Sequence, residues 1–235
     1  MCSLKLVRRL GVTMATRLGL YSARMLEYFR IVIQVLMILV RHVKEGCVAL
    51  DLGCGDGWLT RFMTRFCGFT IGIDIVPNKK WLQDIGYNSN IGFVVADARF
   101  LPIRSNATSF VVALSLLEHV TKWNRIVSEA YRVLRRNGIF IIQVPNLIYF
   151  IEPHTNLPLL GFLPDGLRTK LAQIICCEVH FDCTLKNVIK ELEKHNFENW
   201  VSAYYHIPHK LIPFPPSYFI IALKRAEKGR GRIQE

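Results

Sequence analysis

The sequence predicts an α/β domain in which helices cover both faces of a mostly parallel β-sheet. Short apolar runs such as residues 47–53 (CVALDLG) and 109–117 (SFVVALSLL) lack polar alternation, which is typical of strands buried on both faces. These runs alternate with segments of helical spacing. That alternation is the pattern of parallel strands joined by crossover helices.

The elements follow one another from residue 47 to residue 225. Apolar runs bounded by Gly, Asp or Asn predict strands, and apolar residues at helical spacing predict helices. The expected strands are 47–53, 69–75, 91–97, 109–117, 138–146, 199–207 and 217–225. The expected helices are 57–67, 78–85, 121–136 and 184–195.

The clearest of these helices is 121–136, because its apolar residues form one continuous face. Thr121 is a residue type that caps a helix N-terminus, and Gly138 is the type that ends a helix. The inward face is expected to hold Trp123, Ile126, Val127, Ala130, Tyr131 and Leu134. In the helix 184–195 it is expected to hold Leu185, Val188, Ile189 and Leu192.

The end of the chain breaks the alternating rhythm. Residues 147–180 are rich in Pro, Leu and His and are expected to form an inserted segment. Residues 208–216 (PHKLIPFPP) are too few for a crossover helix, so the last two strands are expected to pair antiparallel. The expected organisation is an N-terminal segment (1–45), a domain (46–225) and a basic tail (226–235).

The N-terminal segment contains the most apolar run of the chain, IVIQVLMILV at 31–40. A bilayer span needs roughly 20 apolar residues, so this run is too short to cross a membrane. We expect one mostly apolar helix over 18–45. Three roles stay open for it: packing on the domain, lying on a membrane surface, or covering the site.

The formal net charge is +12, and most of the excess lies in residues 1–46 and 222–235. Basic ends of this kind fit nucleic acid, an anionic membrane surface or an acidic partner, or form an ordinary solvated surface. The first 13 residues contain no apolar stretch typical of a secretory signal, and Met1 and Met14 are both candidate starts. The seven cysteines are an odd number, so we expect a reduced, cytoplasmic setting with peripheral membrane contact as an option.

A cysteine-rich stretch, CCEVHFDC at 176–183, invites a zinc interpretation. Adjacent Cys176 and Cys177 rarely bind one ion, and the spacing is not that of a CxxC pair. We therefore predict no metal site.

A glycine-rich turn at Gly53, Gly55 and Gly57 follows the first strand. Such a turn presents backbone N–H groups and lets a ligand approach closely. Asp74 ends the second strand, where a carboxylate can accept hydrogen bonds from both ribose hydroxyls; Asp97 ends the third, where it can accept from an adenine amine. With Asp51 in the first strand, these carboxylates favour a ligand that combines adenosine with a positive charge.

Together these motifs resemble those of the class I S-adenosylmethionine-dependent methyltransferases, in the type 11 or UbiE-like branch. The matching stretches are LDLGCGDG, GIDIV, VVADARFLP, FVVALSLLEHV and EAYRVLRRNGIFIIQVPN, within residues 46–146. The resemblance implies a three-layer, Rossmann-like fold whose seven-stranded sheet has the order 3-2-1-4-5-7-6, with strand 7 antiparallel. It also implies S-adenosyl-L-methionine as the cofactor.

The resemblance implies roles for individual residues as well. The turn with Asp51, Gly53 and Gly55 would lie under the methionine part of the cofactor, and Asp74 would hold the ribose. Asp97 and the Ala98 backbone would hold the adenine. The implied cofactor-binding set is Asp51, Gly53, Cys54, Gly55, Asp74, Ile75, Asp97, Ala98, Ser115 and Leu116. For the Cys54 side chain we favour a small buried residue over any thiol chemistry.

An NAD-binding domain is the main structural rival. Its fingerprint is G-x-G-x-x-G, whereas this turn reads Gly53-x-Gly55-x-Gly57 and has Trp58 where the third glycine belongs. Asp97 would also have no role in that interpretation, so we reject it.

The methyl acceptor is predicted mainly from absences. The segment after the fourth strand reads SLLE (115–118) and not the [DN]PP[YF] motif of enzymes that methylate exocyclic base nitrogens, and a cytosine-C5 type nucleophile is also missing. The LLEHV stretch (116–120) resembles the branch that acts on small molecules, lipids, quinones and sugars. We therefore expect a small-molecule, lipid, quinone or glycan-like acceptor, methylated at oxygen. RNA methylation through the basic ends and a non-catalytic cofactor-binding protein stay as alternatives.

Three residues are candidates for acceptor binding or proton removal: His119, Glu152 and His154. His119 lies just past the fourth strand, where a general base or a pocket-lining residue would be placed. Glu152 and His154 flank Pro153 in the insertion 147–180, which occupies the position of a substrate cap. The alternatives are a helix-start histidine for His119 and a structural loop for the other two.

Overall fold

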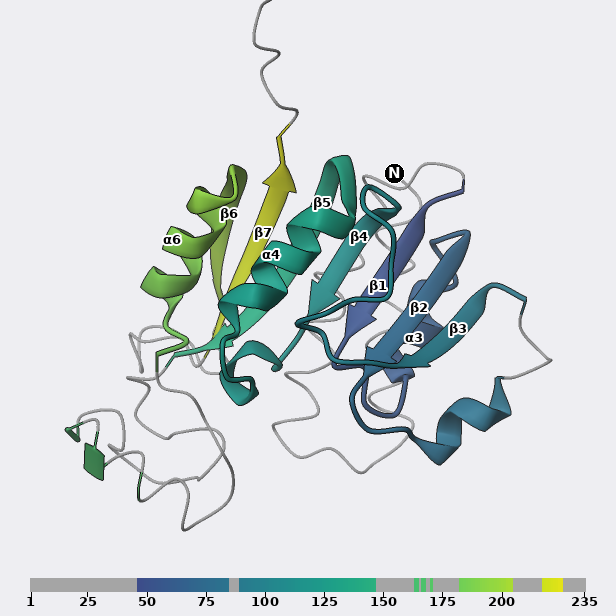
Figure 1. Ribbon diagram of the computed structural model, residues 1–235, viewed down its shortest axis with the longest axis horizontal. Coiled ribbons are helices and arrows are strands. Elements are labelled where there is room, and N and C mark those ends of the chain that lie inside the picture. The colour runs from purple at the N-terminus through teal and green to yellow at the C-terminus, as the bar shows by residue number, and fades with distance from the viewer. Residues whose placement is uncertain are drawn as a thin grey trace, which may run out of the picture.

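The computed structural model describes residues 46–84, 89–146, 182–204 and 217–225, with positions 163, 164, 166, 167 and 170. They form a seven-stranded sheet of order β3-β2-β1-β4-β5-β7-β6 (Figure 1). Strands β1 to β5 pair in parallel, whereas β7 is antiparallel to both β5 and β6. The predicted fold class and strand order are confirmed.

The described elements have the following bounds. The strands are β1 (Val48–Leu52), β2 (Phe69–Asp74), β3 (Ile91–Val95), β4 (Thr108–Ala113), β5 (Leu134–Pro145), β6 (Phe197–Tyr204) and β7 (Ser217–Lys224). The α-helices are α3 (Trp58–Met63), α4 (Asn124–Val133) and α6 (Leu185–Lys194), and two short 3-10 helices are η1 (Lys79–Gln83) and η2 (Leu117–His119).

Successive strand residues point to opposite sides of the sheet, and a core cluster covers each side, so both faces are buried. In β1, Leu50 and Leu52 belong to the core under α4 and α6, whereas Ala49 belongs to the core under α3. Figure 1 shows α4 and α6 in front of the sheet and α3 behind it. The apolar runs of the central strands follow from this double burial.

Two predicted helix signals are wrong. Helix α4 begins at Asn124, and its N-cap residue, Trp123, makes no side-chain capping bond; the Thr121 hydroxyl instead accepts a hydrogen bond from Arg99 Nη1 at 3.1 Å. Gly138 does not end the helix, because α4 ends at Val133 and the chain continues directly into β5.

The start of β5 contains a register shift that explains the position of Gly138. Thr108 pairs with Leu134, but Phe110 pairs with Ile139, so β5 has extra residues between the two pairs. Asn137 takes the left-handed conformation there, with φ of 60°. A Cβ added at Gly138 would lie 2.8 Å from the Arg135 carbonyl oxygen, so the glycine serves close packing in this bulge.

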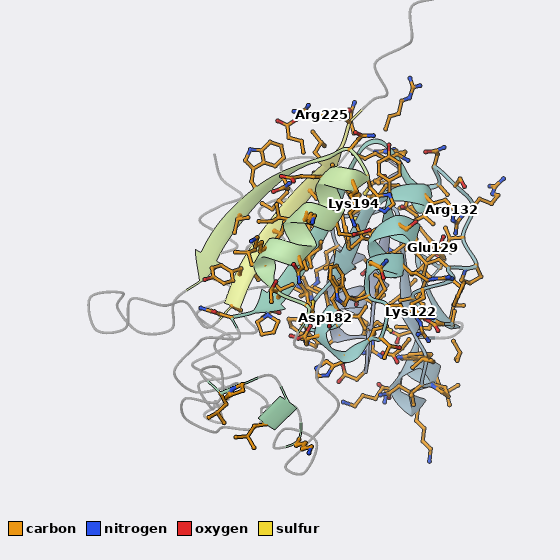
Figure 2. All side chains as sticks on the ribbon, turned by 60° about the vertical axis from the view of Figure 1, so that its left-hand side comes forward. Lys122, Glu129, Arg132, Asp182, Lys194 and Arg225 are labelled. Carbon is orange, nitrogen blue, oxygen red and sulfur yellow. The ribbon has the colours of Figure 1, made fainter. Side chains whose placement is uncertain are left out.

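Helix α6 agrees with its prediction. The Thr184 hydroxyl caps it by accepting a hydrogen bond from the Asn187 N–H, and Val188 and Leu192 are fully buried. Figure 2 shows Lys194 on α6 and Glu129 and Arg132 on α4, the two neighbouring helices of this face.

The predicted N-terminal helix (18–45), the tail (226–235) and most of the insertion 147–180 lie outside the described residues. Glu152 and His154 are among them. Within the described part of the chain, none of the helices has the length and apolar content needed to cross a membrane.

A buried lysine joins the ends of three elements far from the glycine turn. Lys224 is 7% exposed, and its ammonium group donates to the carbonyl oxygens of Tyr131 and Leu134 at 2.7 Å and to Asn106 Oδ1 at 2.9 Å. The two carbonyls lie at the C-terminal end of α4, where a positive charge is favourable. The ammonium also lies 4.4 Å from the centre of the Tyr131 ring.

We expect Lys224→Met to lower the free energy of unfolding by about 2–4 kcal/mol, because it leaves buried carbonyl oxygens without their donor. Urea unfolding of the two proteins measures the difference. The neighbouring Arg225→Met is the control, since Arg225 pairs with Glu198 on the surface and its loss should change stability little. Equal effects of the two substitutions would contradict the assigned role of Lys224.

Candidate cofactor-binding site

The glycine turn after β1 takes a conformation that side chains disfavour. Gly53, Gly55 and Gly57 have φ angles of 70°, 53° and 81°, all in the left-handed region. The N–H groups of Gly53 and Cys54 both donate to the Ile73 carbonyl oxygen of β2, at 2.8 and 3.1 Å. The turn is therefore bound to the neighbouring strand before α3 begins.

Space at the turn is limited by the segment that follows the neighbouring strand β4. A Cβ at Gly53 would lie 2.8 Å from Leu116 Cδ1, so a side chain cannot fit there without displacing Leu116. Leu116 follows β4, and the neighbouring Ser115 has a φ of 49°, unusual for a residue with a side chain. The Ser115 hydroxyl donates to Gln143 Oε1 of β5 at 3.1 Å, which links the two strand ends.

Asp74, the last residue of β2, points toward the glycine turn. Its Oδ2 accepts from the Gly55 N–H at 2.8 Å, and its Oδ1 accepts from the Val76 N–H at 3.0 Å. Both hydrogen bonds come from backbone groups and fix the orientation of the carboxylate. Each oxygen retains acceptor capacity for a ligand hydroxyl.

Asp51 lies beneath the turn and not in the cleft. The residue is 3% exposed, and its Oδ2 accepts from the Thr60 hydroxyl of α3 at 2.7 Å. Burial raises the pKa of this carboxyl to about 7, although the hydrogen bond from Thr60 lowers it in part. Asp51 thus connects β1 to α3 and carries less charge near neutral pH than an ordinary aspartate.

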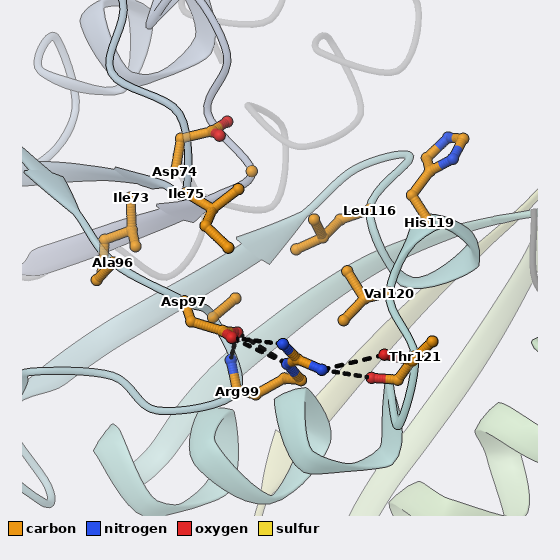
Figure 3. A pocket seen from close by; sticks show the side chains of 12 residues that line it. Ile73, Asp74, Ile75, Ala96, Asp97, Arg99, Leu116, His119, Val120 and Thr121 are labelled. Carbon is orange, nitrogen blue, oxygen red and sulfur yellow. Dashed lines mark hydrogen bonds and ion pairs between the residues drawn. The ribbon is translucent and has the colours of Figure 1, made fainter. Parts of the chain in front are cut away.

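Asp97 makes an ion pair that sequence reasoning missed. Arg99 Nη2 lies 2.7 Å from Asp97 Oδ2, and Arg99 Nε lies 3.0 Å from both carboxylate oxygens. Figure 3 shows the guanidinium between Asp97 and Thr121, where Nη1 donates to the Thr121 hydroxyl and carbonyl oxygens. The hydrogen bonds from Arg99 hold the pKa of Asp97 below the usual range of an aspartate. The signal was present in VVADARFLP, but its spacing does not give the direction of the arginine side chain.

These strand ends enclose a cleft at the carboxyl edge of the sheet, across β2, β3 and the segment after β4. Parallel α/β sheets bind ligands at this edge, where the strand order reverses. Here the reversal lies between β1 and β4. The lining residues are Gly53, Ile73, Asp74, Ile75, Ala96, Asp97, Ala98, Arg99, Leu116, His119, Val120 and Thr121.

The predicted cofactor-binding residues divide into two groups. Those that line the cleft are Gly53, Asp74, Ile75, Asp97, Ala98 and Leu116. Those that do not are Asp51, Cys54, Gly55 and Ser115, which lie in or beside the turns that shape it. Among the candidate catalytic residues, His119 lines the cleft, and Figure 3 shows its ring at the rim, away from Arg99.

The acidic character of the cleft is weaker than three aspartates suggest. Arg99 neutralises Asp97, and Asp51 is buried with a raised pKa. Asp74 is therefore the main source of negative charge among the three. The three aspartates therefore do not contribute equally to the attraction of a positively charged ligand.

The described cysteines are buried thiols. Cys54 packs against Gly72, where an added Cβ would lie 2.9 Å from the sulfur, and burial raises the pKa of its thiol. Burial likewise raises the pKa of Cys183. Cys176, Cys177 and His180 lie outside the described residues, and the described part of the chain contains no cluster of His, Cys, Asp and Glu that could hold a metal.

Comparison with known proteins agrees with this architecture. Residues 50–142 match the family model described as a methyltransferase domain. An uncharacterised protein of Methanocaldococcus jannaschii is 32% identical over 52% of this chain and 45% of its own length. The ubiquinone/menaquinone biosynthesis C-methyltransferase UbiE of Blochmanniella pennsylvanica is 30% identical over 63% of this chain and 65% of its length. The chain spans about half to two thirds of the length of these relatives.

Among solved structures, the 1,6-didemethyltoxoflavin-N1-methyltransferase of Burkholderia thailandensis superposes on this chain with a TM-score of 0.58 and 16% identity. The superposition covers 83% of this chain and 79% of the Burkholderia chain. That structure contains S-adenosylhomocysteine. At this identity the likeness establishes a shared fold.

A seven-stranded sheet of this order, with a glycine turn and acidic strand ends at its carboxyl edge, defines a class I methyltransferase domain. The family-model match over residues 50–142 and the sequence relatives support a class I S-adenosylmethionine-dependent methyltransferase, with S-adenosylmethionine as the cofactor.

The raised pKa of Asp51 gives a testable pH dependence. The folded protein keeps a proton on this carboxyl between its ordinary pKa of 3.8 and about 7, whereas the unfolded chain loses it. Asp51 therefore lowers stability as pH rises through this window, by up to about 4 kcal/mol at about 1.4 kcal/mol per pKa unit. We expect Asp51→Asn to gain stability relative to the unmodified protein over this range, as measured by urea unfolding. A difference that is constant with pH would contradict the assignment.

Proposed function

We propose that this protein transfers a methyl group from S-adenosylmethionine to a small-molecule or lipid-like acceptor. The observation that carries the proposal is the cleft itself. It combines a turn of three left-handed glycines with an oriented carboxylate, Asp74, one strand away. That pairing suits a ligand with a ribose and a methionine side.

The cofactor would be held by residues of the cleft. Asp74 would accept hydrogen bonds from the ribose hydroxyls, and Asp97 with the Ala98 N–H would bind the adenine edge. Gly53 and Leu116 would lie beside the methionine part. The apolar side chains of Ile75, which is 64% exposed, and Val120 would contact the adenine faces.

The bound cofactor supplies an activated methyl group on a sulfonium. The protein then has to align the acceptor with that methyl group and exclude water. A base is needed only when the acceptor carries a proton to lose. His119 at the rim is our candidate for this role among the described residues, and Glu152 and His154 stay candidates on the sequence pattern.

The class of acceptor rests on the sequence pattern and on the names of relatives. The relative UbiE is named as a C-methyltransferase of ubiquinone/menaquinone biosynthesis, and the Burkholderia enzyme is named as an N1-methyltransferase of 1,6-didemethyltoxoflavin. Both support a small or lipid-like acceptor here. Oxygen is the acceptor atom that the sequence analysis predicts, and mass fragmentation of the product separates an O-methyl from a C-methyl or N-methyl group.

Binding of S-adenosylhomocysteine, measured by calorimetry, tests the cofactor site. We expect Asp74→Asn to bind about 10- to 100-fold more weakly, because a hydrogen bond to a charged group is lost. Asp182→Asn is the control: this carboxylate lies near the start of α6, where it accepts from the Trp123 indole, and it should leave affinity unchanged. Equal affinity of Asp74→Asn and the unmodified protein would exclude Asp74 as a cofactor ligand.

Methyl transfer tests the acceptor. The protein is incubated with methyl-labelled S-adenosylmethionine and an extract of its own source, and the products are divided into organic, RNA and protein fractions. We expect the label in the organic fraction, and a loss of at least tenfold in turnover for His119→Ala without loss of cofactor affinity. Label in RNA would instead support the alternative in which the basic ends contact phosphates. Cofactor binding without any labelled product would support a non-catalytic protein.

A further inference from the structure

The underside of the glycine turn, on the side away from the cleft, contacts a small aromatic cluster. Phe93 of β3 lies against the turn: a Cβ at Gly57 would lie 2.6 Å from its ring, and so would a Cβ at Gly72. Trp81 of η1 stacks on Phe93, with ring centres 5.0 Å apart and an angle of 8° between the planes. Trp81 is 6% exposed and Phe93 is half-buried, so the stack is largely shielded from solvent.

Trp81 also binds the turn directly. Its indole N–H donates to the Gly55 carbonyl oxygen at 2.9 Å, across 26 positions of sequence. The Gly55 N–H donates to Asp74 on the other side. Gly55 is therefore held at both of its backbone polar groups, once by the predicted ribose ligand and once by η1.

A second contact from α3 and η1 supports the same turn. Arg61 Nη1 donates to the Asp56 carbonyl oxygen, Nη2 donates to the Lys80 carbonyl oxygen, and Nε donates to Asp84 Oδ2, each at 2.8 Å. The Arg61 guanidinium lies 5.7 Å from the centre of the Phe93 ring. Arg61 thus ties the turn, η1 and the aromatic stack together.

We propose that Trp81 is a positioning residue for cofactor binding, which holds the glycine turn in its binding conformation before the cofactor arrives. Glycine loses more conformational freedom than any other residue when it is ordered, and this turn has three glycines in left-handed conformations. A turn that is already ordered avoids that cost at the moment of binding. Trp81 does not line the cleft, so it acts through Gly55 and not by contact with the ligand. The inference rests on the proposed function, because it concerns the same site.

The test is Trp81→Phe in the full-length chain, which keeps an aromatic ring against Phe93 but removes the indole donor. We expect S-adenosylhomocysteine to bind about 3- to 10-fold more weakly, as for one lost hydrogen bond. Trp123→Phe is the matched control, because Trp123 is also 6% exposed and its indole donates to Asp182 at 3.2 Å, away from the glycine turn. It should lose similar stability without losing affinity.

Two further measurements separate positioning from general stability. Amide hydrogen exchange at residues 55–57, without ligand, should be faster in Trp81→Phe and unchanged in Trp123→Phe. The indole N–H resonance of Trp81 should shift when S-adenosylhomocysteine is added, while that of Trp123 stays in place. Affinity of Trp81→Phe within twofold of the unmodified protein, or an equal loss in Trp123→Phe, would overturn the proposal.

The same measurements distinguish a failure of this inference from a failure of the proposed function. If the unmodified protein does not bind S-adenosylhomocysteine, the proposed function fails and the role of Trp81 in cofactor binding fails with it. Faster exchange at residues 55–57 in Trp81→Phe would then show only that Trp81 orders the turn. If the unmodified protein binds and Trp81→Phe binds equally well, the proposed function stands and this inference alone is wrong.

Discussion

The ring of Phe93 occupies the space that side chains at Gly57 and Gly72 would need. A Cβ at either position would come within 2.6 Å of the ring, a separation that packed atoms do not tolerate. Because Gly72 is paired with Asp51 on one side and Phe93 on the other, the three strand ends have to keep this order and register. Phe93 therefore packs against both the turn after β1 and the strand β2 that ends in Asp74.

Charge around the cleft is arranged so that one carboxylate remains available. Asp51 is buried against Thr60, and Asp97 is paired with Arg99. Asp74 is held by backbone N–H groups, which orient it without neutralising it by a charged side chain. The three aspartates look equivalent in the sequence, since each lies at or near a strand end. Their surroundings give them different roles. Asp51 has a structural role under the turn, Asp97 forms an ion pair at the edge of the cleft, and Asp74 keeps acceptor capacity for a ligand.

The sequence was sufficient to predict the sheet and part of the cleft lining, because those features depend on local sequence patterns. Apolar runs that end in Gly or Asp place Gly53, Asp74 and Asp97 at the same edge. The helix boundaries predicted from Thr121 and Gly138 were wrong because both residues have other roles. The Thr121 hydroxyl accepts a hydrogen bond from Arg99, and Gly138 lies in a bulge of β5.

The contacts that support the cleft from outside were not predictable from the chain. The Trp81 indole reaches Gly55 over 26 positions, and Arg99 reaches Thr121 over 22. Each bond joins segments whose distance in space is set by the whole sheet. Periodicity and motif spacing contain no information on such pairs. From the sequence, Trp81 therefore looks like an ordinary interior residue and Arg99 like an ordinary surface residue.

The hydrogen bonds from Arg99 to Thr121 span the point at which the strand order of the sheet reverses. Strands β3, β2 and β1 lie on one side of the cleft, and β4 begins the other half of the sheet. Arg99 follows β3, whereas Thr121 follows β4, so one side chain bridges the mouth between the two halves. The segment after β3 is also fastened to α4, because Glu129 Oε2 accepts from the Leu101 N–H and Arg132 donates to the carbonyl oxygens of Leu101 and Ile103. The width of the mouth is thus determined by side-chain cross-links as well as by the twist of the sheet, and any breathing motion that widens it has to break charged hydrogen bonds.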